Sequence, residues 1–113
     1  MAKDDYHVLA YKFLAYLYVQ LKAGEDVSAQ MISADSPLLG VNSRYWLYIM
    51  ENLQAEGYIR GLSFEHAWGN EVFVQGLDDC EITPAGIAYL CDNGFLEKVK
   101  QFLKDVKEIT PFV

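Results

Sequence analysis

The two histidines are the first residues to consider for acid–base or metal chemistry. His7 follows Asp4 and Asp5, and His66 follows Glu65 directly. A metal site or a general base needs partners at suitable spacing, and neither histidine has a cysteine or a second histidine nearby. We therefore interpret both as surface or half-buried structural residues, the first on a helix flank and the second in a β-hairpin.

The densest acidic cluster is the run Asp78-Asp79-Cys80-Glu81. Its acids are contiguous, whereas a calcium loop places oxygen ligands at alternate positions around a central glycine. A nucleophilic cysteine needs a cationic setting that lowers its pKa, and carboxylates crowd this one. We expect a solvated acidic loop. Cys80 and Cys91 are too few for a structural zinc site and are expected to be reduced, partly buried thiols, although a disulfide between them stays open.

Glycines do not form a phosphate-binding loop in this chain. Gly57, Gly61, Gly69 and Gly76 do not lie between a strand and a helix N-terminus at the required spacing, so they are interpreted as turn and strand-edge residues. No nucleophile, base, metal site or phosphate site stands out. The sequence therefore predicts a protein that is not an enzyme, with no catalytic residues, no metal, no cofactor and no small-molecule substrate.

Length and composition predict a single domain over residues 1–113. A hydrophobic content of 52% is enough for a continuous core, and 9 basic against 16 acidic residues give a formal charge of -7. That charge disfavours phosphate backbones and anionic membranes. The N-terminus has no signal-peptide pattern, and no apolar stretch near it approaches the roughly 20 residues that cross a bilayer. We expect a cytoplasmic protein with no membrane partner.

The elements that position these residues begin with a helix over 5–23, ended by a left-handed cap at Gly24. Its first apolar face comprises Tyr6, Leu9, Ala10, Phe13, Leu17 and Leu21. A second apolar strip comprises Val8, Tyr11, Ala15, Tyr18 and Val19. Because the helix is apolar nearly all round, we expect it to be covered on both sides.

A helix-turn-helix follows. Ser28 precedes a short helix over 29–33, Pro37 and Gly40 interrupt the helical pattern over 34–41, and Asn42 or Ser43 caps a third helix that reaches residue 56. The expected buried stripe of this third helix comprises Trp46, Ile49, Met50 and Leu53.

The rest of the chain predicts a hairpin and two more helices. The runs 58–67 and 71–75 flank a turn at 68–70, as in a β-hairpin. Thr83-Pro84 opens a helix that closes at Gly94, and an amphipathic helix over 95–109 carries Lys100, Lys104 and Lys107 on one side. The fold class is α+β: a winged helix-turn-helix core over 5–93, with three helices and a hairpin wing, followed by two additional C-terminal helices.

Several motifs carry a family resemblance. The stretches are Leu39-Gly40-Val41-Asn42-Ser43-Arg44-Tyr45-Trp46, Leu53 to Gly61, Ile82 to Leu90, Asp92-Asn93, and the ending Ile109-Thr110-Pro111-Phe112-Val113. Together they resemble the YjcQ-like family, small winged-helix proteins of Gram-positive bacteria and their phages. The resemblance implies the fold and a phage or prophage setting. It implies no particular activity, so no functional residues are carried over.

Two binding hypotheses remain, both regulatory in kind. DNA binding would use the helix over 43–56, whose expected partner-facing residues are Arg44, Tyr45, Leu47, Tyr48, Asn52 and Gln54. Glu51 faces the same way, and the segment 58–94 has one basic residue against six acids, a net charge of -5. Contact with a protein partner is therefore favoured over DNA.

The favoured protein partner is a second copy of the chain. The strip Val8, Tyr11, Ala15, Tyr18 and Val19 would form a two-fold homodimer contact. The competing account is that the C-terminal helix covers the same strip within one chain.

Overall fold

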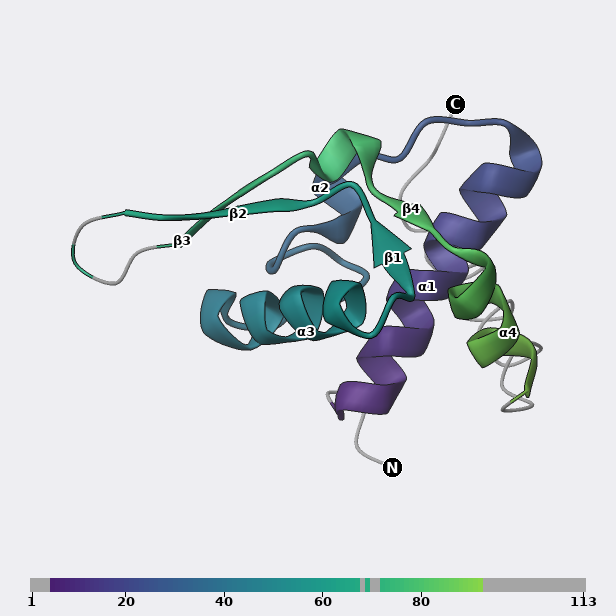
Figure 1. Ribbon diagram of the computed structural model, residues 1–113, viewed down its shortest axis with the longest axis horizontal. Helices are drawn as coiled ribbons and strands as arrows, with labels where there is room; N and C mark the ends of the chain where they lie inside the picture. The colour runs from purple at the N-terminus through teal and green to yellow at the C-terminus, as the bar shows by residue number, and fades with distance from the viewer. Residues whose placement is uncertain (1–4, 68, 70–71, 93–113) are drawn as a thin grey trace.

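Three helices come first along the described chain, and short antiparallel strands and a fourth helix follow them (Figure 1). The structure is a computed structural model that describes residues 5–67, 69 and 72–92. Its elements are α1 (Tyr6–Ala23), α2 (Ala29–Ile32), α3 (Ser43–Ala55), β1 (Ile59–Arg60), β2 (Ser63–His66), β3 (Val72–Gln75), the 3-10 turn η2 (Leu77–Asp79), β4 (Glu81–Ile82) and α4 (Pro84–Asp92). The described part is therefore α+β, as predicted.

Helix α1 is covered on both sides, as its all-round apolar character predicts. Leu9, Phe13 and Leu17 on the first face are buried, and so are Tyr11 and Ala15 on the second strip. Leu21 departs from the prediction, because its side chain is 52% exposed. It lies in the last turn, and residues 21–26 are all exposed, so the end of the helix projects beyond the core. Gly24 caps it with φ 69°.

Helix α3 begins where the sequence predicts. The side chain of Asn42 accepts a hydrogen bond from the Tyr45 backbone N–H at 2.9 Å, which satisfies one of the free donors of the first turn. The buried residues of α3 are Trp46, Ile49, Met50 and Leu53, so the predicted stripe is confirmed. The Trp46 indole N–H donates to the Ile32 carbonyl at 2.7 Å and thereby ties α3 to α2.

The predicted hairpin exists, but its first strand is shorter than expected. Strands β2 and β3 pair antiparallel, with Ser63 opposite Gln75 and His66 opposite Val72, and they extend as a ribbon from the rest of the fold (Figure 1). The preceding residues form the separate strand β1, which pairs with β4 instead. Gly61 divides the two strands: its φ is 103°, and a Cβ there would lie 2.5 Å from the Asp79 carbonyl oxygen.

Helix α4 follows β4 through the predicted cap. The Thr83 hydroxyl accepts a hydrogen bond from the Gly86 N–H at 3.1 Å and donates to the Gly57 carbonyl, so it also fixes the helix start to the end of α3. Helix α4 packs beside α1 and β4. The expected end at Gly94 and the helix over 95–109, with Lys100, Lys104 and Lys107, lie outside the described residues. Within those residues, no helix has the length and hydropathy that a membrane span requires.

Candidate functional site

The face of α3 that points away from the core carries a stripe of exposed residues, called here the outer stripe. It consists of Arg44, Tyr48, Glu51 and Ala55, at intervals of four, three and four positions, which place them on one side of a helix. Tyr48 is 58% exposed and lies between the two charged residues. Its ring meets the ring of Tyr6 edge-on at a centroid distance of 6.0 Å, so α1 supports it from one side.

The two charges of the outer stripe have no partner within the part of the chain that is described. Arg60, by contrast, forms an ion pair with Glu81 at 2.6 Å, and Lys22 lies 5.2 Å above the centre of the Tyr18 ring. Arg44 and Glu51 are both exposed and make neither kind of contact there. The outer stripe therefore presents one cation and one anion to solvent.

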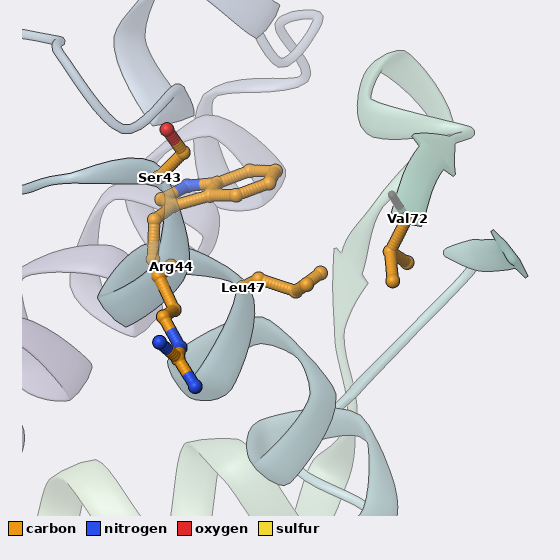
Figure 2. A pocket seen from close by; sticks show the side chains of 5 residues that line it. Ser43, Arg44, Leu47 and Val72 are labelled. Carbon is orange, nitrogen blue, oxygen red and sulfur yellow. The ribbon is translucent and has the colours of Figure 1, made fainter. Parts of the chain in front are cut away.

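An apolar groove lies beside the outer stripe, between α3 and the hairpin. Its volume is about 580 Å³, and Ser43, Arg44, Trp46, Leu47 and Val72 line it. Figure 2 shows Leu47 reaching from α3 toward Val72 on β3, while the guanidinium of Arg44 points away from Val72. The groove and the outer stripe together form a surface with apolar and aromatic groups and few charges.

Two polar residues predicted to face a partner are used inside the chain. The Gln54 amide nitrogen donates to the Leu62 carbonyl at 2.9 Å, and its oxygen accepts from the Leu62 N–H at 2.9 Å. Gln54 therefore connects α3 to the base of the hairpin, which corrects its expected place among the free surface groups. Asn52 donates to the Tyr48 carbonyl at 2.8 Å, and Tyr45 is half-buried. Arg44, Leu47 and Tyr48 remain available on the surface of α3.

The predicted dimer strip on α1 is largely enclosed within one chain. Tyr11 and Ala15 are 4% and 1% exposed, which corrects the expectation that they form an open seam. Helix α4 gives the reason: the Tyr89 ring stacks on Tyr11 at 5.3 Å and on Tyr58 at 4.7 Å. The other members of the strip, Val8, Tyr18 and Val19, are half-buried.

Burial raises the pKa values of the two stacked tyrosines, Tyr11 and Tyr89. Desolvation, the nearby Tyr89 and a hydrogen bond to it raise the pKa of Tyr11 to about 12. Desolvation also raises the pKa of Tyr89. His7 lies beside Tyr89, with its Nδ1 3.1 Å from the Tyr89 hydroxyl, whereas His66 is exposed on β2. No group of three acidic, histidine or cysteine side chains in the described ranges could hold a metal ion.

The acidic run is only partly a solvated loop. Asp78 and Asp79 are exposed in η2, but Cys80 is 2% exposed, and burial together with Glu81 raises its pKa to about 12. Cys80 and Cys91 are both free thiols, the second exposed. A hollow of about 260 Å³ brings this run against the acids at positions 25 and 26. Sequence reasoning missed this pairing, because only the tertiary fold joins the two acidic segments.

The sequence of this chain matches a known protein family. The family described as YjcQ protein matches residues 11–109, which include α2, α3, the hairpin, α4 and all of α1 after its first five residues. No curated protein and no solved structure matches the chain. The match covers most of the sequence and agrees with the motifs that suggested it. The chain belongs to the YjcQ protein family.

Proposed function

We propose that this chain is a non-catalytic interaction module of the winged-helix type, in which the surface of α3 contacts another polypeptide. The order of elements supports this architecture, because α2 and α3 come where a winged helix has its helix-turn-helix and the β2–β3 ribbon comes where it has its wing. In DNA-binding helix-turn-helix proteins the second helix, which corresponds to α3, is the one that enters the major groove. Because fold alone does not give function, the surface chemistry of α3 has to decide the kind of partner.

The observation that carries the proposal is the exposed Tyr48 on the outer stripe, beside the apolar groove. Tyrosine, tryptophan and arginine are enriched where proteins meet. The rings of tyrosine and tryptophan bury apolar area at a low cost in conformational entropy. Tyr48 is 58% exposed, Leu47 reaches across the groove, and Arg44 stands at the edge. This combination suits a polypeptide better than a phosphate backbone.

Binding to DNA is the second candidate, and exposed Arg44 near the start of α3 is the observation that favours it. The surrounding charge opposes it. Glu51 shares the outer stripe, and the segment 58–94 has a net charge of -5, with its single cation Arg60 already paired to Glu81. DNA affinity at physiological salt depends on neutralising several phosphates, and this surface offers few cations for that.

Capture from a lysate of the encoding bacterium tests the proposal, since the expected phage or prophage setting makes host proteins the natural source of partners. The wild-type chain, Tyr48→Asp and Phe73→Asp are each immobilised, and each receives lysate with and without nuclease treatment. Phe73 is the matched control, because it is 53% exposed but lies on the hairpin. We expect a protein that wild type and Phe73→Asp retain and Tyr48→Asp loses. Retention of nucleic acid only, abolished by nuclease, would contradict the proposal.

A further inference from the structure

We propose that α3 contacts the α3 of a second copy of this chain, packed antiparallel across a two-fold axis. The inference rests on the proposed function and names its partner. A two-fold contact requires one self-complementary patch: where residue i of one copy meets residue j of the other, j of the first also meets i of the second, so every pair occurs twice. The outer stripe has that property in its sequence spacing and in its charges.

The spacing places opposite charges opposite each other. Arg44 is three positions before Leu47, and Glu51 is three positions after Tyr48, so the midpoint of the stripe falls between Leu47 and Tyr48. When two such helices lie antiparallel about this midpoint, Arg44 of each copy faces Glu51 of the other. The exposed Tyr48 rings meet at the centre, and the small exposed Ala55 leaves room at each end.

Pairing in this way breaks no ion pair among the described residues, because Arg44 and Glu51 have no ion-pair partner there. Exposed ion pairs add little affinity, but like charges brought together oppose association, so the charges set the orientation and Tyr48 supplies most of the buried area. The other large exposed apolar residues lack such symmetry. Phe73 has Glu65 directly opposite it on the hairpin, and Leu21 borders the acidic hollow.

One helix face is smaller than the roughly 800 Å² per partner that a stable interface buries, so we expect a weak dimer that forms as concentration rises. Sedimentation equilibrium from micromolar to millimolar protein measures it. Wild type should move from the single-chain mass of 12.9 kDa toward twice that value. Arg44→Glu alone and Glu51→Arg alone each place like charges together twice, and we expect each to weaken self-association roughly tenfold.

The mixture of these two variants is the decisive arm. In the mixed dimer, both acidic residues of the first variant face both basic residues of the second, so an equimolar mixture should associate at least as well as wild type. The double variant R44E/E51R should recover for the same reason. Lys22→Glu and Glu65→Arg make the same charge changes at exposed positions away from α3 and should leave self-association as in wild type. Circular dichroism confirms that each variant is folded.

Three results would overturn the inference: a single-chain mass at every concentration, self-association that neither single variant weakens, or a mixture no better than its components. The proposed function fails separately. If the wild-type chain is monomeric but still captures a protein through Tyr48, the proposed function holds and only the proposal that a second copy is the partner fails.

Discussion

The amide of Gln54 should contribute measurably to stability, because it joins α3 to the base of the hairpin. Gln54→Ala removes two hydrogen bonds of 2.9 Å and leaves the N–H and the carbonyl of Leu62 without partners. Leu62 is 7% exposed, so water replaces those bonds poorly. At about 1 kcal/mol net for each bond, the loss is about 2 kcal/mol. For a domain of this size, that corresponds to a fall in Tm of about 10 °C.

Urea denaturation followed by circular dichroism measures the change, with Gln30→Ala as the matched control. Gln30 is exposed on α2 and should cost less than about 0.5 kcal/mol. Gln54→Glu adds a second test: its carboxylate can accept from the Leu62 N–H but cannot donate to the Leu62 carbonyl, whereas its protonated form can do both. The deficit of this variant should therefore shrink as pH falls. Equal stability of Gln54→Ala and Gln30→Ala would refute the role assigned to Gln54.

Three further predictions follow from the buried groups. Iodoacetamide at pH 8 should modify the exposed Cys91 quickly and the buried Cys80 only after unfolding, and mass spectrometry that finds two rapid additions to the native chain would contradict this. Folding raises the pKa of Cys80 from 9.0 to about 12 and that of Tyr11 from 10.0 to about 12, so above pH 9 the unfolded chain releases protons that the folded chain still holds. The contribution of these two groups to the free energy of unfolding should therefore be complete below pH 9 and fall as pH rises toward 12. Unfolding curves measured at alkaline pH that show no such fall would contradict this. Trp46→Phe should cost about 1–3 kcal/mol, since it strands the Ile32 carbonyl, and thermal melts that match wild type would exclude that role.

Much of the helical part could be predicted because its signals are local. Asn42 caps α3, Gly24 ends α1 and Thr83-Pro84 opens α4, each through contacts within a few residues. The buried stripe of α3 follows from helical periodicity. The two-residue strands β1 and β4 are too short to show any periodicity, and their pairing joins residues more than twenty positions apart.

In the candidate site, too, local features could be predicted from the sequence and long-range contacts could not. The exposure of Arg44 and Tyr48 follows from the helical wheel, but the wheel also places Gln54 on the surface. Its amide pairs with Leu62, which follows Gly61, and the positive φ of Gly61 lies outside what a helical wheel can predict. The covering of Tyr11 likewise depends on Tyr89, which comes from α4 at the other end of the described chain.

An NMR dilution series shows directly whether the outer face of α3 is a surface for polypeptide contact. Amide ¹H–¹⁵N shifts of the wild-type chain are compared between micromolar and millimolar concentration, without added nucleic acid. We expect concentration-dependent shifts centred on Arg44, Tyr48 and Glu51 in α3, while the shifts of residues in the α1 strip, such as Ala15, stay unchanged. Shifts that do not change with concentration, together with α3 shifts that appear only when duplex DNA is added, would contradict it.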